Sequence, residues 1–235
     1  MPIARVHGRV LLVPPNAAKD RPMPALRHAI TAVALAASTA GVAACASSPE
    51  VVDDRVLVIG DSLVRGNAGA IERGLAEAGW DPLVDGRGGW SIGRWAGALA
   101  PVADEARARV AVVVLGTNDC VRRCNDVSQG ITRIMDTLTD AGVERVFWLN
   151  VQEDADYPTH PEYVNAFLNQ AAAQWRQLTI VDLNGAMSGR ADLHQSDGVH
   201  FNEAGALVLT QLIVDSLSPL ASESRAQRGQ VTPER

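Results

Sequence analysis

Two short aliphatic runs constrain the fold of this chain more than any other feature. Val110–Leu115 is an uninterrupted apolar segment that ends at Gly116, and Val56–Ile59 is a similar segment that ends at Gly60. Runs of this length and composition are typical of strands that are buried on both faces, as they are in parallel sheets. Parallel neighbours need long crossover connections, so we expect helices between the strands.

Three further strands and five helical patterns complete this alternation. The strands are expected at residues 82–84, 146–151 and 179–181, and the helices at 64–78, 92–105, 128–141, 162–175 and 202–217. Gly79 and Gly142 are expected to end helices, and Ser128 and Asn202 to cap their beginnings. This order predicts an α/β fold of three α/β/α layers, with a flavodoxin-like five-stranded parallel sheet in the order 2-1-3-4-5.

Polar and glycine-rich segments follow four of the five predicted strands. They are Gly60–Leu63, Asp85–Ser91, Gly116–Asp119 and, after a loop, Asp197–Asn202. Ligands of open parallel sheets bind beyond the carboxyl ends of the strands. We therefore expect the fold to gather these four segments on one rim of the sheet.

The residue types on this rim suit acyl transfer, which needs a nucleophile, a base, a group that orients the base, and donors for an oxyanion. Ser62 lies at a strand-to-helix junction, where its hydroxyl can project outward and its N–H lies at the positive helix end. Asp197 and His200 are three residues apart, so the carboxylate can fix the imidazole tautomer. Asn118 offers a side-chain amide, and Gly89 offers an unobstructed backbone N–H.

In this order the four segments resemble the four motif blocks of the SGNH (GDSL-like) serine hydrolase family, and the resemblance extends from Arg55 to Leu217. It implies that Ser62 is the nucleophile and an oxyanion donor, and that Asp197 and His200 are the triad acid and base. The family comprises esterases, lipases, thioesterases and carbohydrate deacetylases, which work through an acyl-enzyme without a cofactor.

The resemblance also assigns the remaining oxyanion donors. The asparagine of the third block corresponds to Asn118, and the glycine of the second block corresponds to Gly89, with Gly88 as the rival register. Taken alone, each segment has a simpler interpretation as a capped turn, a loop or a helix start. For Asp61 and Asp119 that simpler interpretation is favoured, with each a buried carboxylate that shapes its turn.

Several residues near these blocks are candidates for substrate contact or loop structure. Trp90 and Trp95 are candidate substrate contacts, with packing in the core as the alternative. The loop of residues 152–161 should reach the same rim and could gate the site, although such loops are more often simply solvated. Arg122 and Arg123 could bind an anionic group, with a solvated face as the alternative.

Cys120 and Cys124 directly follow the third block. In an oxidising compartment we expect them to form a disulfide, with two free thiols as the alternative. Such a short ring contributes little chain entropy, but it would stiffen the loop that carries Asn118.

Residues 1–44 differ from the rest of the chain. Arg27 and His28 precede an apolar run from Ala29 to Ala44, which is shorter than the roughly 20 residues that a membrane span needs. This pattern is typical of a secretory signal that starts at Met1 or Met23. Its end resembles the lipobox of bacterial lipoproteins, which implies lipidation of Cys45, attachment to a membrane and an extracytoplasmic location. Ordinary secretion and a retained helix are the alternatives.

The remaining composition fits a single domain. Residues 45–53 are expected to be a tether, 54–220 the hydrolase domain, and 221–235 a polar, disordered tail. The formal net charge of −6 and the lack of a basic stripe argue against nucleic-acid binding. The five histidines are scattered and the three cysteines form no ligand set, so no metal site is predicted.

Together these features predict a secreted serine esterase that hydrolyses O-acyl esters, with short acyl or acetyl groups, of an envelope glycan or lipid. An O-acyltransferase on the same scaffold is one alternative hypothesis. A non-catalytic, glycan-binding lipoprotein is another.

Overall fold

The computed structural model describes residues 54–121, 124, 126–155 and 157–230, with side chains described as far as residue 220. The chain divides into two units, residues 1–48 and 49–235, and every described residue belongs to the second. The predicted signal, the tether with Cys45, and the Arg122–Arg123 pair lie outside the described residues.

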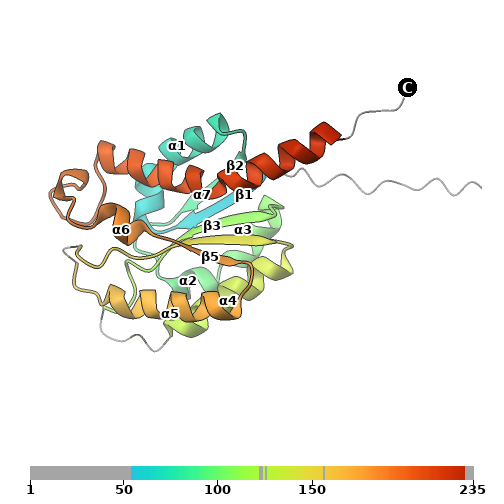
Figure 1. Cartoon of the computed structure of the whole chain (residues 1–235). Helices are drawn as coiled ribbons and strands as arrows, with labels where there is room; N and C mark the ends of the chain where they lie inside the picture. Colours follow the sequence, from blue (N-terminus) through green and yellow to red (C-terminus); the bar gives the residue numbers. More distant parts are fainter. Residues whose placement is uncertain (1–53, 122–123, 125, 156, 231–235) are drawn as a thin grey trace, which may run out of the picture. The chain divides into compact units, whose positions relative to one another are not determined.

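Five strands form one sheet in the order β2-β1-β3-β4-β5 (Figure 1). The strands are β1 (Arg55–Gly60), β2 (Asp81–Gly86), β3 (Val110–Val114), β4 (Arg145–Leu149) and β5 (Leu178–Val181). All neighbouring pairs are parallel. The predicted fold class and strand order are confirmed.

Helices cover both faces of this sheet (Figure 1). One face is covered by α1 (Ser62–Glu77) and α7 (Glu203–Gln230), and the other by α2 (Ile92–Ala96), α3 (Leu99–Ala106), α4 (Val127–Asp140) and α5 (Pro161–Gln174). The short elements α6 (Leu183–Met187) and η1 (Ala191–Leu193) lie between β5 and α7. Among the described residues, no helix combines the length and the apolarity needed to cross a membrane.

The alternation of side chains along each strand divides the core in two. Leu57 and Ile59 of β1 belong to the core beneath α2–α5, whereas Val56 and Val58 belong to the core beneath α1 and α7. Successive side chains of a strand point to opposite faces, so a strand between two helical layers is apolar throughout. This is why β3 is buried along its whole length.

Two predicted helix boundaries differ from the structure. The helix expected at residues 92–105 is divided, because α2 ends at Ala96 and α3 begins at Leu99. Ser128 does not cap α4, which already begins at Val127 after Asp126. Asn202 does cap α7, because its side-chain oxygen accepts a hydrogen bond from the N–H of Gly205 at 3.1 Å.

The last helix is longer than its sequence pattern suggested. α7 continues to Gln230 through Pro219, so residues 221–230 have a helical backbone rather than the disorder predicted for them. This segment is polar and lacks an apolar stripe, which is the signal that periodicity detects. It is nevertheless rich in Ala, Glu, Arg and Gln, which favour helix, and it extends a helix that is already formed.

A glycine allows the backbones of β2 and α1 to approach closely at the carboxyl edge of the sheet. A Cβ atom at Gly86 would collide with the backbone N of Arg65 and lie 2.6 Å from its Cα. Arg65 lies in the first turn of α1, three residues after Ser62. The lack of a side chain at Gly86 therefore helps to place the helix that begins at Ser62.

We predict that Gly86→Ala lowers the free energy of unfolding by about 1–3 kcal/mol, because α1 must move away from β2. Gly66→Ala, also near the start of α1, is the matched control, since a Cβ there meets nothing within 4 Å. That control should raise the free energy of unfolding by about 0.5–1 kcal/mol. Urea denaturation measures both, and equal stability of Gly86→Ala and wild type would contradict the close approach.

Candidate active site

Ser62 is the first residue of α1 and directly follows the strand–helix junction of β1. Asp61 caps this helix, because its Oδ1 accepts a hydrogen bond from the N–H of Leu63 at 2.9 Å. The first N–H groups of a helix have no partner within it and lie at its positive end. The backbone N–H of Ser62 is therefore a donor available to an anionic group.

His200 joins Ser62 to Asp197 through both of its ring nitrogens. Its Nε2 lies 2.9 Å from Ser62 Oγ, and its Nδ1 lies 2.7 Å from Asp197 Oδ2. The structure thus brings together three side chains that the sequence separates by up to 138 positions. A hydroxyl, an imidazole and a carboxylate in this order can pass a proton from the serine to the imidazole.

The surroundings of Asp197 keep its carboxylate ionised. The hydrogen bond from His200, followed by bonds from the backbone N–H groups of Val199 and His200, holds the pKa of Asp197 well below its usual range. An ionised carboxylate beside Nδ1 favours a proton on that nitrogen. This tautomer leaves Nε2 as the acceptor for the hydroxyl hydrogen of Ser62.

The side-chain amide of Asn118 lies on the same rim. Its Nδ2 is 3.2 Å from Asp61 Oδ2 and 3.2 Å from the carbonyl oxygen of Trp90. Both amide hydrogens therefore have acceptors, one on the segment after β1 and the other on the segment after β2. The amide of Asn118 therefore lies at the rim where the four segments were expected to meet.

The glycine pair after β2 forms a tight turn, closed by a hydrogen bond from the N–H of Trp90 to the carbonyl of Arg87 at 3.1 Å. Gly89 has φ +70°, and a Cβ there would meet nothing within 4 Å. A Cβ at Gly88 would instead lie 2.9 Å from a guanidinium nitrogen of Arg65. A side chain at Gly89 would thus meet open space, whereas one at Gly88 would meet Arg65.

Two buried carboxylates support these segments. Asp61 is fully buried, and burial, reinforced by the charge of Asp119, raises its pKa to about 7. Burial raises the pKa of Asp119 to about 6, and its carboxylate accepts from the N–H of Ile92 at 3.0 and 3.3 Å. Both therefore hold helix beginnings, as the simpler interpretation of these residues anticipated.

The two tryptophans after β2 differ in their surroundings. Trp95 is fully buried and donates its indole N–H to the carbonyl of Gly60 at 2.9 Å. It is a core residue, so the hypothesis that it contacts substrate is wrong. Trp90 is half-buried, and the guanidinium carbons of Arg87 and Arg94 lie 4.5 and 4.7 Å from the centre of its ring.

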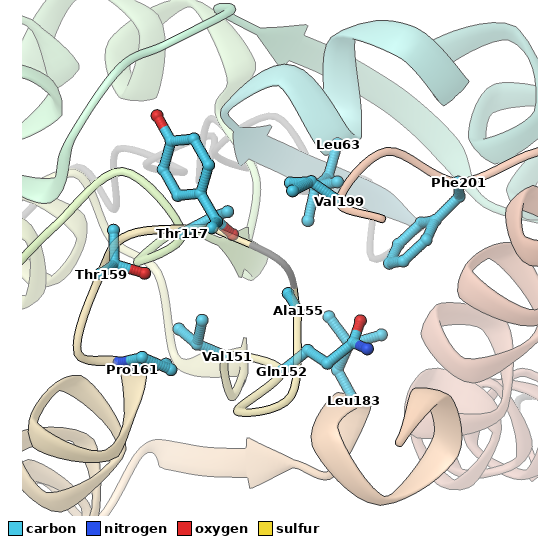
Figure 2. Close-up of a pocket in the computed structure, with 11 residues that line it drawn as sticks. Leu63, Thr117, Val151, Gln152, Ala155, Thr159, Pro161, Leu183, Val199 and Phe201 are labelled. Carbon is cyan, nitrogen blue, oxygen red and sulfur yellow. The ribbon is translucent and has the colours of Figure 1, made fainter. Parts of the chain in front are cut away.

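A small, mainly apolar pocket lies among the loops of this rim (Figure 2). Leu63, Thr117 and Val199 line it, and each is a sequence neighbour of Ser62, Asn118 or His200. The other lining residues are Val151, Gln152, Ala155, Tyr157, Thr159, Pro161, Leu183 and Phe201. The loop after β4 therefore reaches the rim, as expected, and the enclosed space holds about one water-sized group.

A hydrogen-bond network behind the pocket was not predicted from the sequence. His194 Nε2 lies 2.8 Å from Gln152 Oε1, and Gln152 donates in turn to Asp154 at 2.8 Å. Asp154 also accepts from the hydroxyl of Ser188 at 2.9 Å and the N–H of Gly189 at 2.7 Å. These contacts join the loops after β4 and β5, and no local sequence pattern predicts them.

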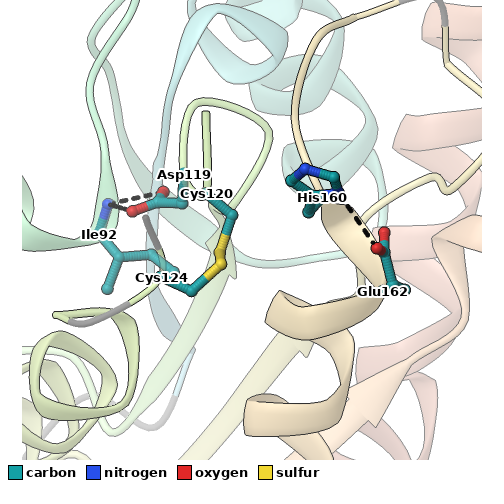
Figure 3. Close-up of a disulfide and its surroundings, with 6 residues drawn as sticks. All are labelled: Ile92, Asp119, Cys120, Cys124, His160 and Glu162. Atoms are coloured by element: carbon teal, nitrogen blue, oxygen red, sulfur yellow. Dashed lines mark hydrogen bonds and ion pairs between the residues drawn. A yellow bond between two sulfur atoms is a disulfide. The ribbon is translucent and has the colours of Figure 1, made fainter. Parts of the chain in front are cut away.

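Cys120 and Cys124 are joined by a disulfide with a Cα–Cα distance of 4.5 Å (Figure 3). Cys120 is buried and has φ +58°, a left-handed conformation that is uncommon for residues other than glycine. It directly follows Asp119, whose carboxylate accepts a hydrogen bond from the N–H of Ile92, drawn as a dashed line in Figure 3. Within the described part of the chain, no group of histidine, cysteine or acidic side chains could hold a metal ion.

Comparison with solved structures shows the same fold in several hydrolases. A carbohydrate esterase family 3 from Talaromyces cellulolyticus has 19% identity and a TM-score of 0.61, covering 72% of this chain and 98% of that chain. TesA has 22% identity and a TM-score of 0.59, covering 70% and 98%. The lipase/acylhydrolase from Enterococcus faecalis has 19% identity and a TM-score of 0.58, covering 77% and 99%.

Comparison of sequences identifies the family. No curated protein is significantly similar in sequence to this chain. The model of the GDSL-like Lipase/Acylhydrolase family matches residues 58–208, which is more than half of the chain and includes all four rim segments. The chain therefore belongs to the GDSL-like lipase/acylhydrolase family of serine ester hydrolases.

Proposed function

We propose that this protein is an exported esterase that hydrolyses short-chain O-acyl esters through Ser62, His200 and Asp197. The observation that carries the proposal is the continuous chain of hydrogen bonds from Ser62 Oγ to His200 Nε2 at 2.9 Å and from His200 Nδ1 to Asp197 at 2.7 Å. Membership of the esterase family supports the same chemistry.

In the first half of the reaction, His200 Nε2 takes the hydroxyl proton as Ser62 Oγ attacks the ester carbonyl. The resulting oxyanion accepts hydrogen bonds from the N–H groups of Ser62 and Gly89 and from the amide of Asn118. Asp197 stabilises the imidazolium. The tetrahedral intermediate then collapses, the alcohol leaves with the proton from His200, and an acyl group remains on Ser62.

In the second half, water replaces the alcohol. His200 Nε2 removes a proton from the water as its oxygen attacks the acyl carbonyl, and the same donors hold the second oxyanion. Collapse of this intermediate returns the proton to Ser62 Oγ and releases the carboxylic acid. In both halves the groups that polarise the carbonyl are N–H donors of the chain itself.

The size of the pocket beside Ser62 supports a short acyl group. It is lined mainly by aliphatic side chains and encloses space for about one water-sized group, which suits the methyl of an acetyl ester better than a long chain. A wider hollow on the same rim, lined by residues that include Ser91 and Asn118, leaves room for a larger alcohol. We propose that this alcohol is a sugar or lipid of the cell envelope, and a carbohydrate esterase among the similar structures is consistent with it.

We predict that Ser62→Ala lowers kcat for p-nitrophenyl acetate by a factor of about 10³ or more, because the variant cannot form the acyl-enzyme. His200→Ala should lower kcat to a similar extent, since the two side chains act as one unit. Ser91→Ala is the control, because Ser91 caps α2 and contacts neither residue. Turnover by Ser62→Ala at the wild-type rate would contradict the proposed mechanism.

We predict that kcat/KM falls steadily from p-nitrophenyl acetate to the butyrate and octanoate esters. Leu183→Ala enlarges the pocket, so it should raise the butyrate-to-acetate ratio of kcat/KM by about 10-fold. Leu209→Ala is the matched control, because Leu209 is equally buried in the same core but does not line the pocket. A ratio that changes equally in both variants would show that the pocket does not receive the acyl chain.

We also propose that the protein is exported and anchored through lipid on Cys45, as its lipobox-like segment suggests. The disulfide between Cys120 and Cys124 is consistent with an oxidising compartment. Cys45→Ser should move the protein from the membrane fraction of cells to the soluble fraction, whereas Ser62→Ala should leave its distribution unchanged. Mass spectrometry of the native N-terminus provides the direct measurement, and an unmodified residue upstream of Cys45 would contradict lipidation.

A further inference from the structure

Asp61 does more than cap α1, because its two carboxylate oxygens serve different parts of the fold. Oδ1 accepts from the N–H of Leu63 at 2.9 Å, whereas Oδ2 accepts from Nδ2 of Asn118 at 3.2 Å. The second bond joins residues 57 positions apart. One carboxylate thus connects the helix that begins at Ser62 with the loop that carries Asn118.

A cap alone would not require a buried carboxylate. Ser91 caps α2 with its hydroxyl, which accepts from the N–H of Arg94 at 3.3 Å. Serine and aspartate are comparable as caps, but an ionised carboxylate is far more costly to bury than a hydroxyl. Asp61 is fully buried nonetheless, and the negative charge of Asp119 further disfavours its ionised form. What the carboxylate adds is an acceptor on the side of the loop after β3, where it accepts from Asn118 and is also hydrogen-bonded by the side chain of Thr117.

This second acceptor determines which end of the Asn118 amide points into the rim. The Nδ2 atom faces two acceptors, Oδ2 of Asp61 and the carbonyl oxygen of Trp90, each at 3.2 Å. If the amide turned over while Asp61 is ionised, above its pKa of about 7, its oxygen would face those same two acceptors with no hydrogen between them. Without Asp61, only one neutral carbonyl would oppose that rotation.

The two bonds of the amide also differ in strength. When Asp61 is ionised, above its pKa of about 7, its bond to the amide is charge-assisted and stronger than the bond to the carbonyl of Trp90. Trp90 directly follows Gly89, the other loop donor of the proposed mechanism. When an oxyanion forms beside Ser62, we therefore expect the amide hydrogen that is bonded to Trp90 to move to it, while the bond to Asp61 persists.

We propose that Asp61 is a positioning residue for the oxyanion hole, which acts by holding the Asn118 amide in its donating orientation next to the helix of the nucleophile. The inference rests on the proposed role of Ser62 and extends it to a residue that touches neither the substrate nor the reacting atoms.

Two substitutions separate this role from helix capping. Asp61→Ser keeps a side chain that can cap α1 but is too short to reach Asn118. Asp61→Asn keeps the size of the side chain, but it replaces one of the two oxygens by an NH2 donor, so the atoms that face Leu63 and Asn118 can no longer both accept. We expect each variant to lower kcat for p-nitrophenyl acetate by about 10- to 100-fold with KM changed by less than about threefold. A wild-type kcat in Asp61→Ser would overturn the proposal, because capping alone would then explain Asp61.

A double-mutant cycle with Asn118→Ala gives the sharper test. If Asp61 acts through the amide, Asp61→Ser should change kcat by less than about threefold when that amide is already absent. Independent effects that multiply in the double variant would overturn the proposal. The two possible failures can be told apart. A wild-type rate in Ser62→Ala would contradict the proposed mechanism itself. Multiplicative effects in an enzyme that still depends on Ser62 would contradict only the role of Asp61.

Asp182 provides a matched control for the cycle. Its Oδ1 accepts from the N–H of Gly185 at 2.9 Å, as a helix cap, and from the amide of Asn150 at 3.0 Å. Like Asp61, it therefore caps a helix and binds an asparagine amide, although through one oxygen and at an exposed position, and it does not contact Asn118. Asp182→Ser should therefore change kcat by the same factor in wild type and in Asn118→Ala. If the effect of Asp182→Ser depended on the Asn118 amide as strongly as that of Asp61→Ser, the proposal would be overturned.

The pH dependence of stability shows whether the variants lose activity by unfolding. The charged groups that act on Asp61 are Asp119 and His200, and burial raises its pKa from the usual value near 4 to about 7. Between these values the folded protein binds a proton that the unfolded chain releases, so this group makes wild type less stable as pH rises. The Tm of Asp61→Asn relative to wild type should therefore increase from pH 5 to pH 8, while its kcat stays low. A Tm of Asp61→Asn at or below the assay temperature, together with the low kcat, would overturn the proposal and assign the loss of activity to unfolding.

Discussion

The parallel pairing of β1 with β3 is the constraint on which the site depends. Gly60 lies opposite Val114 in this register, and the N–H of Asp61 donates to the carbonyl of Val114 at 3.3 Å. The chain segments that leave the two strands therefore begin side by side. Ser62 and Asn118 belong to those segments, so the ladder of backbone hydrogen bonds sets the separation between a hydroxyl and an amide that are 56 positions apart in the sequence.

Around this pairing, hydrogen bonds from buried polar groups stabilise the rim of the sheet. Asp61 and Asp119 are both buried and both accept from the beginnings of helices, and the indole of Trp95 donates to the carbonyl of Gly60. Burying a carboxylate opposes folding unless hydrogen bonds compensate. The stability given up at Asp61 is consistent with a site whose donors are arranged before substrate arrives, because such donors need not reorganise as the oxyanion forms.

The sequence predicted those parts of the site that belong to strand ends. Periodicity located β1 and β3, and chain order placed Ser62, Asn118 and His200 on the rim, because parallel strands present their carboxyl ends at one edge. It did not separate Trp90 from Trp95, since both are aromatic residues after the same strand. Only packing shows that the second is enclosed beneath the sheet. The link between His194 and Gln152 was equally hidden, because two loops meet there without any repeated pattern.

By itself, then, the sequence determined the fold class and the strand order, because hydrophobic runs and turn residues act locally, and its motif blocks supplied the candidates for the reacting groups. Tertiary structure alone decided the contacts of the candidate groups, such as His200 with Ser62 and Asp61 with Asn118. The reason is that hydrogen bonds between distant segments depend on ångström-scale placement of backbones. That placement is set by packing in the whole domain and is not encoded at either partner's own position.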